Sequence, residues 1–189
     1  RVKMKNKLEV FSYNGAVPKI HKKAYIHPSV VIIGDVSIGD NCFIGSNVVL
    51  RGDNGKIDII ANSSVQDNCV VHSSTGYETI LHEYSRVGHS AILHGCEIKS
   101  WAVIGMASVL LDGSIIEEYS LIGSMSFVKK GMLIPTKHLA LGSPCIVKRE
   151  LTVKEMEKNR EVTMEYVDYP NTYFKTSRSV EPIYFDESN

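Results

Sequence analysis

The sequence predicts an all-β fold in which short parallel strands wind into a three-sided prism, followed by one C-terminal α-helix. Aliphatic residues recur every six positions, small residues recur four positions later, and glycine often follows the aliphatic. This period fits neither a helix nor an ordinary alternating strand. The aliphatic positions are Ile26, Ile32, Ile38, Ile44 and Leu50; Ile59, Val65 and Val71; Leu81 and Val87; then, after a one-residue slip, Ile92, Ile98, Ile104, Leu110, Ile116, Ile122, Val128 and Ile134.

Each position of the repeat has a physical role. We expect the aliphatic to fill the prism axis and the small residue to fit a tight corner, with glycine supplying backbone freedom where the chain turns. One coil cannot bury its own faces, so stacked coils create the core. Cys42, Cys69 and Cys96 fall in the small slot, and no CxxC pair occurs, so buried, reduced thiols are expected.

The chain divides into three parts. Residues 1–25 form an N-terminal lead-in segment, residues 26–147 the prism, and residues 148–189 a helix and tail. Thr152 and Glu155 form a capping-box pattern at the helix start. Pro170 is expected to end the helix. The helix packs either along its own prism or over a neighbouring subunit, and the sequence leaves both open.

Charge composition excludes some partners. The 21 Lys and Arg residues balance the 21 Asp and Glu residues. A nucleic-acid partner would require a basic face, as would an anionic membrane. The longest apolar stretch, residues 102–111, is too short to span a bilayer. We therefore expect a cytoplasmic protein that binds neither nucleic acid nor membrane.

Three histidines stand out in a repeat that otherwise carries little chemistry: His72, His89 and His94. Three imidazoles around zinc leave a fourth position for water, which is typical of catalytic sites. Since three strands of six residues make one coil, the spacing puts these histidines on neighbouring levels but not on one face. Two chains side by side could supply ligands to one ion. Spacing alone equally allows surface histidines that bind no metal.

Two insertions interrupt the prism close to these histidines. They are Arg51–Lys56 and His72–Ile80. Loops inserted in a regular solenoid are natural places for function.

Five short motifs follow one another along the repeat: Arg51-Gly52-Asp53, Val65-Gln66-Asp67, Val71-His72, Val87-Gly88-His89 and Leu93-His94-Gly95-Cys96. Together they resemble the gamma-class carbonic anhydrase-like hexapeptide-repeat family, over residues 14 to about 149. The short loop after the first histidine and the segment Met125–Lys129 resemble its branch of carnitine-operon and phenylacetate-pathway proteins.

The resemblance implies a left-handed parallel β-helix and a homotrimer with three metal sites between subunits. His72 and His94 would come from one chain and His89 from the next. The ion would be Zn²⁺, or alternatively Fe²⁺ or Co²⁺, since three imidazoles suit all of these. No organic cofactor is indicated.

The same resemblance implies roles for the neighbouring polar residues. Arg51 and Asp53 would form an ion pair across the subunit interface. Asp67 would support the arginine network, and Gln66 would hydrogen-bond the metal-bound water.

The implied activity is that of a carbonic anhydrase: reversible hydration of CO₂ to bicarbonate by metal-bound hydroxide. Two departures bear on proton transfer. Asn54 replaces the glutamate that follows Arg-Gly-Asp in the family, and Asn cannot titrate. The shortened loop holds one carboxylate, Glu78. Glu78 is a candidate proton shuttle, and a solvated loop carboxylate is the simpler interpretation.

Other functions stay open at this stage. An acyl-CoA thioesterase could use the same metal-bound water. A hexapeptide acyltransferase usually carries a catalytic histidine on a large extruded loop, which this chain lacks. A non-catalytic scaffold would have no reason to keep three metal-binding side chains.

Overall fold

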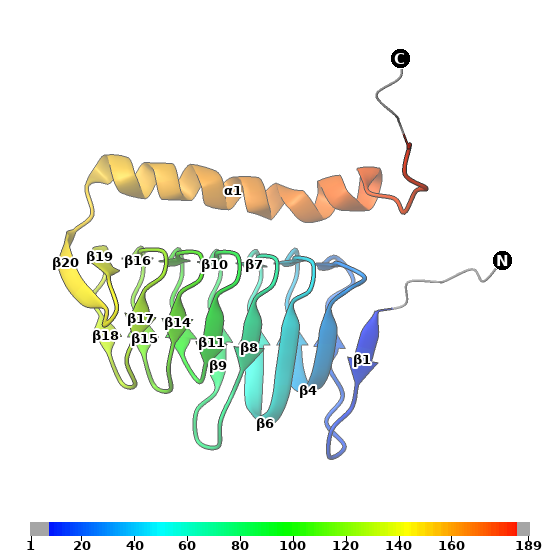
Figure 1. Cartoon of the computed structure of the whole chain (residues 1–189), viewed down its shortest axis with the longest axis horizontal. Helices are drawn as coiled ribbons and strands as arrows, with labels where there is room; N and C mark the ends of the chain where they lie inside the picture. The colour runs from blue at the N-terminus through cyan, green and yellow to red at the C-terminus, as the bar shows by residue number, and fades with distance from the viewer. Residues whose placement is uncertain (1–7, 185–189) are drawn as a thin grey trace.

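The computed structural model describes residues 8–184 and forms a left-handed parallel β-helix with a helix along one side (Figure 1). The predicted prism is therefore confirmed. Residues 1–7 of the predicted lead-in segment and residues 185–189 of the predicted tail lie outside the described residues. Within residues 8–184 no helix has the length and hydrophobicity of a membrane span.

The strands stack into three faces, which we call A, B and C. Face A contains β1 (Glu9–Phe11), the first half of β4 (Val31–Ile38), the first half of β6 (Val49–Ile59), β8 (Val70–His72), β11 (Ile92–His94), β14 (Val109–Leu110) and β17 (Phe127–Val128). Face B contains β2 (Lys19–Ile20), the second halves of β4 and β6, β9 (Thr79–Leu81), β12 (Glu97–Ile98), β15 (Ile115–Ile116) and β18 (Leu133–Ile134).

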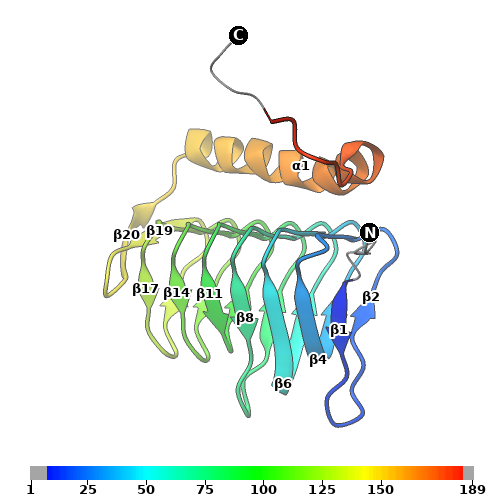
Figure 2. The same cartoon turned by 45° about the vertical axis from the view of Figure 1, so that its right-hand side comes forward.

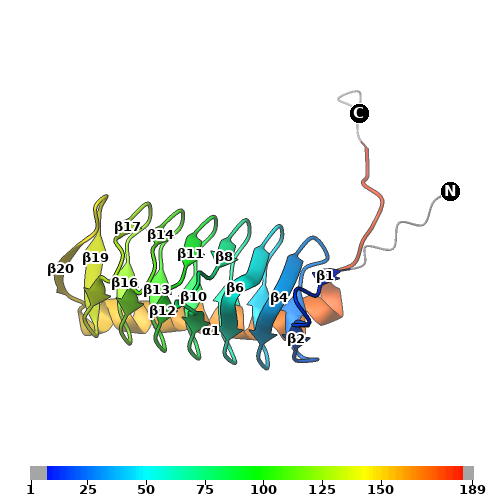
Figure 3. The same ribbon diagram turned by 90° about the horizontal axis from the view of Figure 1, so that it is seen from below.

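Face C contains β3 (Tyr25–Ile26), β5 (Phe43–Ile44), β7 (Ser64–Val65), β10 (Arg86–Val87), β13 (Val103–Ile104), β16 (Leu121–Ile122) and β19 (His138–Leu141). The last strand, β20 (Ile146–Glu150), pairs antiparallel with β19 and ends the face. The strands of each face are stacked along the prism axis, as Figure 3 shows from below.

The repeat places one aliphatic side chain of each strand on the prism axis, with one correction. Leu93 is completely buried, whereas Ile92 is 42% exposed, so the prediction of Ile92 as an axis residue was wrong. The one-residue slip falls after Leu93, between it and Ile98. Gly95 lies in this shortened corner with φ +60°, a conformation that lets the chain turn within fewer residues.

Glycine has a different role from the one predicted. The left-handed corner residue comes three positions after the axis residue, as at Asn41, Asn62 and Tyr84. Gly39, which directly follows an axis residue, does not have a positive φ. A Cβ on Gly39 would lie 2.8 Å from the backbone nitrogen of Ala61 in the next coil. These glycines therefore allow close approach of successive coils rather than backbone freedom.

The cysteines of the small slot are buried and free, as predicted. Burial raises the pKa of the Cys42 thiol to about 11 and those of Cys69 and Cys96 to about 12. Such thiols remain protonated at physiological pH and act as small apolar groups.

Helix α1 (Val153–Thr176) runs along the outside of the prism from the β20 end towards the β1 end (Figures 1 and 2). Thr152 caps it, with the predicted capping box to Glu155. Thr163 accepts a hydrogen bond from Arg86 of face C at 3.2 Å. The helix thus packs on its own chain.

The prediction that Pro170 ends the helix was wrong, because α1 continues to Thr176. A proline inside a helix costs about 3 kcal/mol, which other contacts must offset. Pro170 is buried, and Tyr169 and Tyr173 on either side of it pack against the ring of Phe43. Aromatic packing on face C therefore outweighs the local preference.

We predict that Gly39→Ala destabilises the protein by about 1–3 kcal/mol, the usual range for overpacking, because the added Cβ meets backbone that cannot move aside. Denaturant unfolding measures this change. Glu83→Ala, an exposed site on the same row of corners, is the control. A Gly39→Ala variant as stable as the control would contradict the close-approach role.

Candidate metal centre

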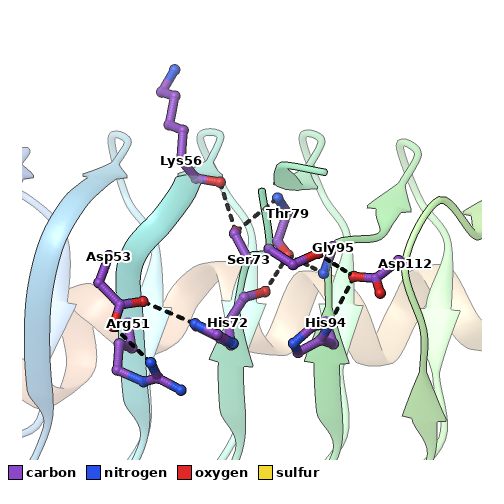
Figure 4. A network of polar contacts seen from close by, with 10 residues as sticks. Arg51, Asp53, Lys56, His72, Ser73, Thr79, His94, Gly95 and Asp112 are labelled. Atoms are coloured by element: carbon purple, nitrogen blue, oxygen red, sulfur yellow. Dashed lines mark hydrogen bonds and ion pairs between the residues drawn. The ribbon is translucent and has the colours of Figure 1, made fainter. Parts of the chain in front are cut away.

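Two of the three predicted ligands meet at one end of face A. His72 ends β8 and His94 ends β11, and the two residues are paired in register on adjacent strands. Since Val71 and Leu93 point to the axis, the alternation of a strand turns the following imidazoles outward. Their ring centroids are 4.9 Å apart (Figure 4).

His94 is held by a carboxylate from the next coil. Its Nδ1 lies 2.7 Å from Oδ1 of Asp112, which also accepts a hydrogen bond from the Ser74 hydroxyl at 2.7 Å. The hydrogen bond from Ser74 makes the largest contribution to the lowered pKa of the Asp112 carboxyl. An ionised carboxylate only accepts, so Nδ1 of His94 carries the proton and Nε2 keeps a lone pair. This carboxylate–histidine arrangement is typical of metal ligands.

His72 is held by a carboxylate from the preceding coil. Its Nε2 lies 2.9 Å from Oδ1 of Asp53, and Arg51 donates to the other oxygen at 2.7 Å. Burial alone would raise the pKa of Asp53, but these two hydrogen bonds outweigh it and lower the pKa. By the same reasoning the lone pair of neutral His72 is on Nδ1. Arg51 and Asp53 thus pair within one chain, and their pairing across subunits stays a prediction.

His89 lies apart from the other two imidazoles. It belongs to the corner between β10 and β11, at the opposite end of β11 from His94. Its Nδ1 is 3.1 Å from Oδ2 of Asp67, whose other oxygen accepts hydrogen bonds from the Ser46 hydroxyl and amide. Burial would raise the pKa of Asp67, but the bonds from Ser46 lower it. Within one chain Asp67 therefore contacts a histidine, and its support of the arginine network stays a prediction.

The donor set fits a metal site only if two chains contribute. Within residues 8–184 of one chain, no three His, Cys, Asp or Glu side chains converge on a common point. Imidazole binds metals through either ring nitrogen, and His94 and His89 both direct Nδ1 at a carboxylate. Three such imidazoles would leave a position open for water.

The two inserted segments lie side by side next to this centre. The Ser73 hydroxyl, in the loop between β8 and β9, donates to the Lys56 carbonyl of β6 at 2.8 Å (Figure 4). Figure 4 also shows the Lys56 side chain pointing away from His72. Glu78 contributes to the raised pKa of Lys56, after the larger effect of its hydrogen bond to Asp58. Glu78 itself is exposed at the end of this loop.

The remaining predicted catalytic residues differ in exposure. Gln66 is buried next to Asp67, at the same corner row as His89. Asn54 is exposed in the middle of β6. Among the described residues, neither forms a side-chain hydrogen bond with a predicted ligand.

Ser74 and Asp112 were not among the predicted site residues. A usable signal was present, because Asp112 lies 18 residues after His94, close to the 17 residues that separate paired positions of β11 and β14. A carboxylate one coil away from a histidine lies beside it in a solenoid.

An apolar strip runs along face A between the His72–His94 pair and His89. The outward residues of successive strands pair in register, and all are hydrophobic: Val31, Val49, Val70, Ile92, Val109 and Phe127. Val70 is 40% exposed and Ile92 is 42% exposed. A contiguous apolar patch of this kind is typical of a protein–protein interface.

Fold and repeat together define a hexapeptide-repeat protein. The family described as bacterial transferase hexapeptide (six repeats) matches residues 18–52. The carnitine operon protein CaiE of Salmonella agona is 42% identical over 161 residues, covering 85% of this chain and 81% of that protein. The chain therefore belongs to the gamma-class carbonic anhydrase-like hexapeptide-repeat family, in the branch that contains CaiE.

Two crystal structures are similar over nearly their whole length. A Bacillus cereus protein provisionally described as an acetyltransferase has a TM-score of 0.88 and 38% identity, covering 90% of this chain and 99% of that one. A hexapeptide transferase family protein from Anaplasma phagocytophilum has a TM-score of 0.84 and 33% identity, covering 87% and 98%.

Proposed function

We propose that this protein is a metal-dependent enzyme like the gamma-class carbonic anhydrases and catalyses reversible hydration of CO₂ at the interfaces of a homotrimer. The observation that carries the proposal is the pairing of His72 and His94 on adjacent strands, where each imidazole contacts the carboxylate of an aspartate. Zn²⁺, or alternatively Fe²⁺ or Co²⁺, would be held by these two side chains and by His89 of the partner subunit. A cytoplasmic location stays a prediction.

A bound divalent metal would lower the pKa of water towards neutrality and polarise the substrate. The chain's own residues prepare the ligands for this. Asp112 and Asp53 fix the orientation of His94 and His72, and Arg51 neutralises the charge of Asp53. Gln66 stays the predicted hydrogen-bond partner of the attacking water.

Proton transfer to solvent is the weak part of the predicted mechanism. Asn54 cannot titrate, and within residues 8–184 the exposed Glu78 has no hydrogen bond or ion pair with His72 or His94. Efficient catalysis needs an acid or base within reach of the proton. We therefore expect the hydration rate to rise with buffer concentration, because buffer molecules can take over this transfer.

The trimer is supported by the apolar strip on face A. His72 and His94 lie at one end of the strip's strands and His89 at the other. Three copies that turn face A towards a common three-fold axis would bring one end of face A next to the opposite end of face A in the neighbouring copy. Burying such residues stabilises an assembly by about 25 cal/mol per Å² of apolar surface.

We predict that Ile92→Asp dissociates the assembly, because it places a charge in the centre of the strip. Size-exclusion chromatography with light scattering should give three times the 21.0 kDa chain mass for the wild type and a smaller mass for the variant. Leu133→Asp is the matched control, since Leu133 is 55% exposed but lies on face B. Equal masses for both variants and the wild type would count against face A as the interface.

We predict that the protein loaded with zinc, and separately with iron under anaerobic conditions, hydrates CO₂ in stopped flow. His89→Ala should abolish turnover and metal binding while leaving the β-sheet circular dichroism spectrum unchanged. His138→Ala, outside the site, should behave as the wild type. Full metal occupancy without turnover would refute the carbonic anhydrase activity, whereas loss of the fold in His89→Ala would indicate a structural histidine.

Acyl transfer from coenzyme A is a second candidate function. It is favoured by the descriptions of the Bacillus cereus and Anaplasma phagocytophilum relatives as transferases. The connection between β8 and β9 spans only residues 73–78, which is short for an extruded catalytic loop. A panel of acyl-CoA thioesters separates the possibilities: transfer to an amine acceptor supports an acyltransferase, and release of free acid supports a thioesterase. A trimer that binds no metal and turns over nothing would support a scaffold.

A further inference from the structure

One carboxylate oxygen joins the loop between β8 and β9 to the His94 imidazole. Oδ1 of Asp112 lies 2.7 Å from Nδ1 of His94 and accepts a hydrogen bond from Ser74 at 2.7 Å. Ser74 belongs to the loop, His94 to β11, and Asp112 to the corner one coil further on. Three successive levels of the prism thus meet at a single atom. Figure 4 shows His94 and Asp112 of this group.

Tyr77 also packs this loop against the corner that contains Gly113. A Cβ on Gly113 would lie 3.0 Å from Cε1 of Tyr77, so the ring covers the space that a side chain at Gly113 would fill. Nζ of Lys130, from the following coil, lies 4.8 Å from the centre of the same ring, a cation–π distance. Backbone hydrogen bonds between Ser74 and Tyr77 close the loop into a tight turn.

These contacts decide which nitrogen of His94 can bind a ligand. A neutral imidazole carries one proton, and the hydrogen bond that one nitrogen makes determines where the proton sits. Asp112 accepts from Nδ1, which leaves the lone pair on Nε2. Because the Ser74 hydroxyl donates to the same oxygen, the carboxylate has a second contact that holds it against rotation.

We propose that Asp112, held by Ser74, is the positioning residue that sets the tautomer and ring orientation of His94, and that the loop between β8 and β9 is a part of the ligand scaffold. The link to metal binding rests on the proposed function. The tautomer of His94 does not, because the contacts that set it lie within one chain.

The first test is ¹⁵N NMR of histidine-labelled, metal-free protein at a pH where the imidazoles are neutral. In the wild type, the His94 signals should report a proton on Nδ1. In Asp112→Ala the Nε2-protonated tautomer should gain population, and in Ser74→Ala the same shift should be smaller. Glu118→Ala is the matched control, because Glu118 is an exposed carboxylate in the same coil as Asp112. An unchanged His94 tautomer in Asp112→Ala would overturn the proposal.

The second test is Zn²⁺ affinity, measured by competition with a chelator. Loss of a carboxylate behind a ligating histidine typically weakens binding by about 10–100-fold, and we expect this range for Asp112→Ala. Asp112→Asn keeps one acceptor oxygen and should recover part of the loss, which a purely structural role would not explain. Wild-type affinity in Asp112→Ala would overturn the proposal. Absence of Zn²⁺ binding in the wild type would refute the proposed function alone, because the tautomer shift would still decide this inference.

Discussion

The burial of one aliphatic side chain per strand on the prism axis is the constraint on which the rest of the structure depends. It fixes the register of each strand against its neighbours, so that Val71 and Leu93 point inward on adjacent coils. The strand alternation then turns the next residues, His72 and His94, outward at the same end of face A. The centroids of the two imidazole rings are 4.9 Å apart because two apolar residues are stacked beneath them.

The same register places polar residues of successive coils next to one another. A side chain one coil ahead or behind lies beside its neighbour, as Asp53 lies beside His72 and Asp112 beside His94. Each imidazole therefore meets a carboxylate supplied by another level. Placing His89 at the far end of β11 separates it from this pair in one chain. In the proposed trimer, the apolar strip between them would lie in the contact between copies, and that contact would complete the ligand set.

The periodic parts of this structure could be predicted from the sequence, because each strand repeats the same burial demand. The prism, its small inward slot with Cys42, and the capping box at Thr152 all follow from such local patterns. The error at Ile92 arose because two adjacent aliphatics offered the same hydrophobicity, and only the corner geometry at Gly95 decides between them.

Other features depend on contacts between distant segments. Pro170 stays inside α1 because tyrosines around it pack on face C, which no local pattern encodes. The role of Gly39 depends on the next coil rather than on its own φ. Asp112 was not predicted because its partner, His94, lies 18 residues earlier in the chain. In a solenoid, a separation of about one coil places two residues side by side.

The measurement that tests the account most directly is metal binding by mixed assemblies. His72→Ala chains keep His89, and His89→Ala chains keep His72 and His94. If each site is shared between chains, neither variant binds Zn²⁺ alone. After denaturation and refolding as a one-to-one mixture, about a quarter of the interfaces should be restored by random assembly. No recovery in a mixture that assembles normally, or full Zn²⁺ binding by either variant alone, would contradict a site built between subunits.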